Sequence, residues 1–143
     1  MRNSFLLLFF FQFIEFTCEP VHVTYFYNNS NDSLKIVLQL DTAQIRMKYH
    51  RLEFEPYMFN HIEPDTLALR KIIDTAKFQC IVFLYPRSKF IVESGFSEKP
   101  DLKFVKMSIF KGKDSLVYVG RNKINNIFVR DNSGHHIYNY YFQ

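Results

Sequence analysis

The sequence predicts an all-β fold, an antiparallel sandwich or barrel, with one short amphipathic helix near residues 65–76. Three observations lead to this prediction. Runs rich in β-branched and aromatic residues recur at spacings of about ten residues, and polar turns separate them. The two apolar runs within Cys80–Glu93 are joined by Pro86-Arg87-Ser88, which favours a hairpin at the centre of a sheet. The composition, 48% hydrophobic and 22% charged over 143 residues, is typical of one packed domain.

Residues 1–18 have the organisation of a signal peptide. A basic start at Arg2 precedes the ten-residue apolar run Phe5–Ile14, which Glu15 ends. A membrane-spanning helix needs about 20 apolar residues, so this run is too short to be one. We therefore expect a secreted, extracellular protein that loses residues 1–18 and keeps residues 19–143 as a single β-rich domain.

The fate of the two cysteines depends on the cleavage point. Cleavage after Cys18 is favoured and leaves Cys80 alone, buried as a small apolar residue. Cleavage before Cys18 would instead allow a Cys18–Cys80 disulfide. The fold has at most one disulfide, so it must be stabilised by its core.

The first strands of the domain are expected at Val21–Tyr27 and Leu34–Leu40, paired as an N-terminal hairpin with a long tip. In the second run every other residue is apolar, which predicts a half-buried strand. The tip carries two glycosylation sequons, at Asn28 and Asn31. In a secreted chain, we expect a glycan on this loop.

The middle of the chain gives one further strand and the only predicted helix. Residues 44–49 alternate apolar and polar, which indicates a third strand. Asp65 or Thr66 is a suitable N-cap, and the residues that follow form one apolar stripe at helical spacing: Leu69, Ile72, Ile73 and Ala76. This pattern predicts a helix lying over a sheet edge or a barrel end.

Strands are expected again in the last third of the chain, over Leu102–Phe110, Ser115–Val119, Asn126–Arg130 and His135–Phe142. Short polar turns separate these segments, and the last of them is the four-residue turn 131–134.

Positive charge gathers in the same third of the chain, although the formal net charge is only +4. Cations alternate there with aromatic residues, which predicts a basic-aromatic binding surface. The cations assigned to it are Lys103, Lys106, Arg121, Lys123 and Arg130. The expected partner is an extracellular protein or an anionic cell-surface glycan. Secretion argues against nucleic acid as the partner, despite the similarity in composition to single-strand binders.

The sequence contains no recognisable catalytic motif, so we predict that the protein is not an enzyme. The chain has four glycines and no Gly-x-Ser-x-Gly segment. Cys80 is not placed at a helix N-terminus that would activate its thiol. His135 and His136 are adjacent on a predicted strand, so their side chains point to opposite faces. No metal or cofactor is therefore predicted.

The function predicted from these observations is a secreted, N-glycosylated β-domain that acts as a binding module for a protein or a cell-surface partner. The alternative is an extracellular carrier that holds a small apolar ligand in a β-barrel cavity, because the chain has 17 Phe and 9 Tyr.

Overall fold

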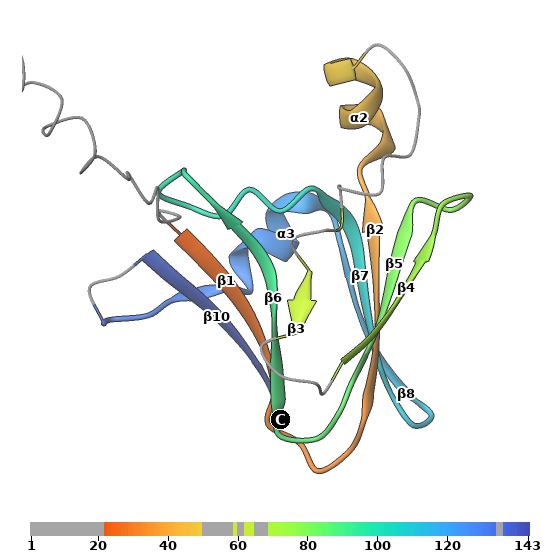
Figure 1. Ribbon diagram of the computed structural model, residues 1–143, viewed down its shortest axis with the longest axis vertical. Helices are drawn as coiled ribbons and strands as arrows, with labels where there is room; N and C mark the ends of the chain where they lie inside the picture. The colour runs from red at the N-terminus through yellow and green to blue at the C-terminus, as the bar shows by residue number, and fades with distance from the viewer. Residues whose placement is uncertain (1–21, 50–58, 60–61, 65–68, 134–135) are drawn as a thin grey trace, which may run out of the picture.

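The computed structural model describes residues 22–49, 59, 62–64, 69–133 and 136–143. These residues form a β-sandwich of two five-stranded sheets, and two short helices accompany it (Figure 1). Sheet A contains, in spatial order, β3 (Glu63–Pro64), β6 (Ser88–Gly95), β1 (His22–Asn28), β10 (His136–Phe142) and β9 (Val129–Arg130). Sheet B contains β4 (Leu69–Asp74), β5 (Gln79–Leu84), β2 (Leu34–Leu40), β7 (Phe104–Lys111) and β8 (Asp114–Val119). The helices are α2 (Thr42–Tyr49) and α3 (Arg121–Asn126). The predicted all-β class is confirmed, and the sheets form a sandwich rather than a barrel.

The core lies between the two sheets, and the strands β1, β2 and β5 bury every second side chain in it. In β2 the predicted alternation is confirmed, because Leu34, Ile36 and Leu38 are all buried. Phe26 and Phe90 of sheet A stack at 5.5 Å between ring centroids. Between β8 of sheet B and β10 of sheet A, the Tyr118 and Tyr140 hydroxyls lie 3.1 Å apart and join the two sheets. Burial, together with this hydrogen bond, raises the pKa of Tyr140.

Two predicted hairpins are wrong, since their strands belong to different sheets. β1 pairs with β6 in sheet A, while β2 pairs with β5 in sheet B. The two chain segments thus run antiparallel as one long ribbon that bends from one sheet into the other, at the lower end of Figure 1. The bend lies at residues 29–33 and 85–87. Because every strand of the ribbon has one apolar face, bending it lets both halves bury that face against each other.

Asn28 fixes the bend between the sheets. Its side chain is 0% exposed. Nδ2 donates to the carbonyl oxygens of Asp32 at 2.8 Å and Tyr85 at 2.9 Å. Oδ1 accepts from the Ser30 backbone N–H at 3.1 Å and from the Ser30 hydroxyl at 2.7 Å. The side-chain amide of Asn28 therefore connects the two chain segments that cross between the sheets, residues 29–33 and 85–87.

The predicted helix at 65–76 is wrong for the part of it that the structure describes, because residues 69–74 form strand β4. This strand pairs with β5 from Leu69↔Leu84 to Asp74↔Gln79. Leu69 and Ile73 pack on the core, whereas Ile72 is 38% exposed on the other face. Six residues of antiparallel pairing outweigh the helical spacing of the apolar residues, and the Ile72-Ile73 pair is β-branched and suits a strand.

The strand predicted at 44–49 is also wrong, because this segment is helix α2. Asp41 caps the helix: its Oδ1 accepts from the backbone N–H groups of Ala43 at 3.1 Å and Gln44 at 3.2 Å. Ile45 is buried but Met47 is 70% exposed, so the apparent alternation of apolar residues does not correspond to one buried face.

The end of the chain differs from the prediction in two respects. Residues 121–126 form α3, whose Ile124 is buried, so the strand predicted at 126–130 shortens to the two residues of β9. The last strand, β10, pairs with β1 in parallel, from His22↔His136 to Asn28↔Phe142. The sandwich is therefore antiparallel except for this one pair among the described strands.

Lys71 holds Phe59 and Ile62 against β4. It shares the inward face of β4 with Leu69 and Ile73, and its Nζ donates to the carbonyl oxygens of Phe59 at 3.3 Å and Ile62 at 3.0 Å. Phe59 is fully buried and stacks on Phe104 at 6.3 Å between centroids. The lysine thus attaches Phe59 and Ile62 to the edge of sheet B.

Candidate binding site on the outer face of sheet B

The outer face of sheet B carries cations beside apolar side chains. The strand register places Arg70, Phe83, Lys35 and Phe110 in one row across four neighbouring strands. Arg70 lies over the Phe83 ring at 5.9 Å and Lys35 lies over the Phe110 ring at 5.7 Å. Alternate strands in a sheet are about 10 Å apart, so the backbones of Arg70 and Lys35 are separated by about this distance. Such a row presents charge and ring surface together.

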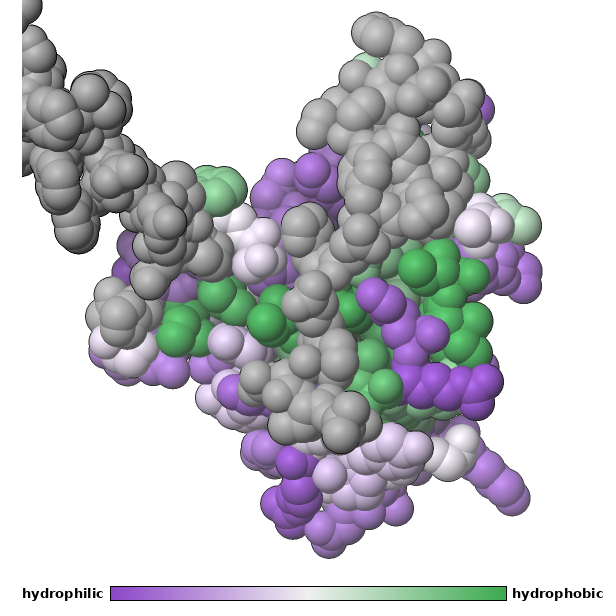
Figure 2. All heavy atoms as spheres, viewed as in Figure 1, coloured by the Kyte–Doolittle hydropathy of each residue, from purple (hydrophilic) through white to green (hydrophobic). Residues whose placement is uncertain are grey.

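A second row lies beside the first and is apolar except for the buried Ser108. It contains Ile72, Ile81, Val37, Ser108 and Val117, which are successive cross-strand partners. Ile72 and Val117 are exposed, and the apolar surface continues over β4 and β5 in Figure 2, beside hydrophilic side chains. No described element covers this face, so it meets solvent as a mixed apolar and basic surface.

The charges on this face are not balanced by acids. Lys106 projects from β7 opposite Gln39 and completes a set of three cations with Lys35 and Arg70. Within the residues that the structure describes, none of the three forms an ion pair. Asp74 lies on the same face but pairs with Lys77 at 3.2 Å. The turn N–H of Lys77 and this charge pair lower the pKa of Asp74.

The sequence-predicted basic residues do not form this set, apart from Lys106. Lys103 and Lys123 are exposed, on the connection before β7 and on α3. Arg121 forms an ion pair with Asp101 and donates from Nε to the Leu102 carbonyl at 3.2 Å. Arg130 is exposed on β9, which belongs to sheet A. The prediction missed Lys35 and Arg70, because only the sheet register brings them onto the face of Lys106.

The two sequons differ in accessibility. Asn28 is buried with its Nδ2, the atom that would carry a glycan, donating two hydrogen bonds inside the bend. The folded domain therefore has no room for a glycan on Asn28. Asn31 is exposed, and Arg87 donates to its Oδ1 from Nη2 at 2.9 Å and from Nε at 3.2 Å. Its Nδ2 points to no protein acceptor among the described residues.

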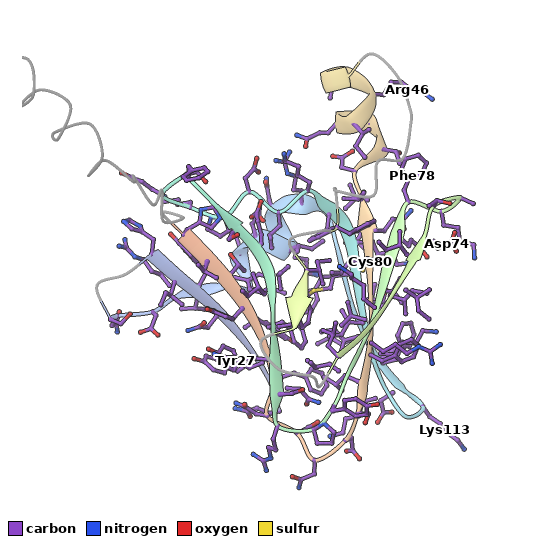
Figure 3. All side chains as sticks on the ribbon, in the orientation of Figure 1. Tyr27, Arg46, Asp74, Phe78, Cys80 and Lys113 are labelled. Carbon is purple, nitrogen blue, oxygen red and sulfur yellow. The ribbon has the colours of Figure 1, made fainter. Side chains whose placement is uncertain are left out.

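Cys80 is a free, fully buried thiol that points into the space between the sheets (Figure 3). Burial raises its pKa to about 12. The thiol is therefore protonated and shielded at neutral pH, which makes it a core residue and not a nucleophile. Cys18 and the predicted signal peptide lie outside the described residues.

His22 is the best-connected titratable side chain, and it acts as a structural anchor. It is 2% exposed, its Nδ1 donates to the Ser97 carbonyl at 2.7 Å, and its Nε2 lies 3.6 Å from Glu93 Oε2. A Cβ placed on Gly95 would lie 2.8 Å from the ring, so the glycine allows this close packing. Because the imidazole is enclosed, it holds the segment after β6 and has no face open to a substrate.

The outer face of sheet A carries a ladder of tyrosines that the sequence analysis did not assign. Tyr27 stacks on Tyr141 at 4.8 Å and contacts Tyr25 at 5.9 Å. Lys89 Nζ lies 4.6 Å from the centroid of the Tyr25 ring. Burial raises the pKa of Tyr27, and the charge of Lys89 opposes the rise. The ring contacts join β1 to β10 and Lys89 adds β6, so this ladder serves mainly to join the three strands; Tyr27 is labelled in Figure 3.

Comparison with protein-family models, with curated proteins and with solved structures found no match for this chain. Within the described ranges, the His, Cys, Asp and Glu side chains form no group of three or more that could hold a metal ion. Neither α2 nor α3 is long and apolar enough to cross a membrane.

Proposed function

We propose that this protein is a secreted binding module that takes an anionic, sulfated glycan on the outer face of sheet B. The observation that carries the proposal is the set of Lys35, Arg70 and Lys106 on one sheet face, without acidic partners in the described part of the chain. Cations fixed over aromatic rings attract sulfate and carboxylate groups, while Phe83 and Phe110 offer apolar surface to the C–H faces of sugars.

Secretion and glycosylation complete the proposal. The sequence pattern of residues 1–18 supports export, and the exposure of Asn31 supports this residue as the glycan acceptor. Asn31 lies in the bend at one end of the sandwich, whereas the three cations lie along the outer face of sheet B.

The alternative of an apolar-ligand carrier has weaker support. It depended on a barrel with a hollow interior, but the strands form two separate sheets. The space between them contains tightly buried side chains such as Phe26, Phe90 and Leu38.

Retention on heparin tests the proposal. The variant Lys35→Gln/Arg70→Gln/Lys106→Gln removes three positive charges from the outer face of sheet B, and we expect it to elute from heparin at clearly lower salt than the unmodified chain. The matched control Lys103→Gln/Lys123→Gln/Arg130→Gln removes the same net charge elsewhere and should elute near the unmodified chain. Chemically desulfated heparin should retain none of the three.

Two results would overturn the proposal. Equal losses in both triple variants would mean that net charge alone drives retention. A loss confined to the control variant would move the binding surface to the residues first predicted from the sequence. Circular dichroism spectra of both variants establish that the fold is kept.

A further inference from the structure

The four outer edges of the two sheets are not equally protected. Exposed edge strands invite pairing with another chain, and proteins usually blunt them with charges, prolines or very short strands. β3 and β9 have two residues each, and β4 carries Arg70, Lys71 and Asp74. β8 has none of these features from Ser115 to Val119, a stretch of five residues without charge, proline or glycine.

β8 is also unusually apolar for an exposed edge. Leu116, Val117 and Val119 are 41%, 42% and 64% exposed. Among the described strands β8 pairs only with β7, so its other side presents unpaired backbone groups. Figure 1 shows the β7–β8 hairpin extending beyond the end of sheet B, and Lys113 marks its tip in Figure 3.

The register of β7 and β8 identifies which backbone groups face outward. The turn at Gly112 and Lys113 pairs Lys111 with Asp114, and Gly112 has φ 58°, as a two-residue hairpin turn requires. The Asp114 N–H therefore points to β7. At the other end, the Gly120 N–H donates to the Val105 carbonyl at 2.8 Å. The backbone groups of the even-numbered residues from Asp114 to Gly120 thus hydrogen-bond to β7. This leaves the N–H and C=O groups of Ser115, Val117 and Val119 at the open edge.

These outward groups define one self-pairing register. If a second β8 lies antiparallel with Val117 opposite Val117, Ser115 faces Val119 on either side of the twofold axis. In each of the three pairs (115 with 119, 117 with 117, and 119 with 115), the outward backbone N–H and C=O groups of one copy face those of the other. Each pair can form two hydrogen bonds, which gives six in total. The same register keeps Val117 on the outer face in both copies and sets Leu116 opposite Tyr118 on the inner face. A register shifted by one residue would set outward backbone groups against inward ones, and it would place opposite side chains on different faces of the sheet.

We propose that the protein forms a symmetric dimer through this edge, with β8 of two copies paired antiparallel about Val117, so that two B sheets join into one. The contact is isologous, as a twofold interface must be. The stretch 115–119 carries no charge, so no like charges oppose each other within it, although the same register brings Lys113 toward Arg121 just outside it. This inference does not depend on the proposed glycan site.

Placing a positive or a negative charge at Val117, on the twofold axis, tests the proposal. Sedimentation velocity of the unmodified chain, over rising protein concentration, should show conversion from monomer to dimer. Val117→Lys and Val117→Asp should each be monomeric, because like charges then lie opposite each other. An equimolar mixture of the two should form a heterodimer. Val129 is 68% exposed on β9, so Val129→Lys is the matched control and should dimerise like the unmodified chain.

Disulfide trapping tests the register separately. Directly opposite residues of a hydrogen-bonded pair have Cα atoms about 5.5 Å apart, which a disulfide can span. Val117→Cys should therefore form a covalent dimer under mild oxidation, while Val129→Cys should not, and Cys80 is too buried to interfere. A chain that stays monomeric at every concentration, or a dimer that both Val117 charge variants leave intact, would refute the proposal.

Discussion

The bend between the sheets gives the sharpest stability prediction, at Asn28. Replacing Asn28 with Ala removes four hydrogen bonds: two donated to the carbonyls of Asp32 and Tyr85, and two accepted from Ser30. A hydrogen bond contributes about 1 kcal/mol net to stability, and more where a buried partner is left without one.

The expected loss is slightly below the sum of four bonds. The Tyr85 carbonyl also accepts from the Ser88 hydroxyl at 2.6 Å, so it keeps one partner in the variant. The Ser30 hydroxyl can likewise donate to the Asp32 carbonyl at 3.2 Å, whereas the buried Ser30 backbone N–H keeps no other acceptor among the described residues. We therefore expect Asn28→Ala to lower the free energy of unfolding by about 3 kcal/mol, with Asn28→Asp also destabilising because a carboxylate cannot donate to the two carbonyls.

Urea denaturation of bacterially produced, glycan-free chain measures this loss. Under these conditions neither sequon is used, so any change reflects the hydrogen bonds alone. Unchanged m-values would show that the shift of the midpoint reports stability. Asn31→Ala is the matched control, since this residue is exposed in the same loop and should change stability by less than about 0.5 kcal/mol. An Asn28→Ala loss under about 1 kcal/mol would refute the role given to this amide.

Three further predictions concern single residues. Lys71→Met should lower the free energy of unfolding by about 1–3 kcal/mol, because it loses the hydrogen bonds to two carbonyl oxygens. The control Arg70→Met changes an outward-facing residue and should lower it little. Similar thermal midpoints for the two variants would contradict this prediction. Because the pKa of Cys80 rises from 9.0 to about 12 on folding, stability should fall above pH 9 by up to about 1.4 kcal/mol per pH unit. Cys80→Ala should show a shallower slope in urea titrations at pH 9 and 10. In a secreting eukaryotic host, Asn31→Gln should abolish a glycan shift on gels; a remaining shift would point to Asn28.

Much of the fold could be predicted because burial leaves a period of two in the sequence. The alternation in Leu34–Leu40 corresponds to a strand with the same bounds, and the strand segments in the last third of the chain recur as β7, β8 and β10. These signals are local: each strand presents one apolar face, and that face must be buried whatever the partner strand is.

The errors arise where pairing partners decide the outcome. The stripe from Leu69 to Ile73 fits a helix by spacing, yet pairing with β5 makes it a strand. Apolar alternation at 44–49 suggested a strand, while the cap at Asp41 was the signal for a helix. Local spacing alone does not distinguish these outcomes, because both patterns place apolar residues on one side over six residues.

The candidate site likewise divides into residues that the sequence predicted and residues that only strand pairing brings together. Lys106 was predicted as a binding residue, but Lys35 and Arg70 lie 71 and 36 positions away from it in the chain and join it only through the register of sheet B. Likewise, Asn28 and Asn31 are equivalent as sequons, and only the bend of the ribbon buries one amide and exposes the other.

The sequence by itself determined most of the strand segments, the polar turns between them, and that the chain has enough apolar residues for one packed domain. The tertiary structure decided which strands are neighbours, that the two expected hairpins separate into different sheets, and which charges share a face. The physical reason is that side-chain alternation depends on burial, a property of each segment, whereas strand order and register depend on contacts between segments far apart in the chain.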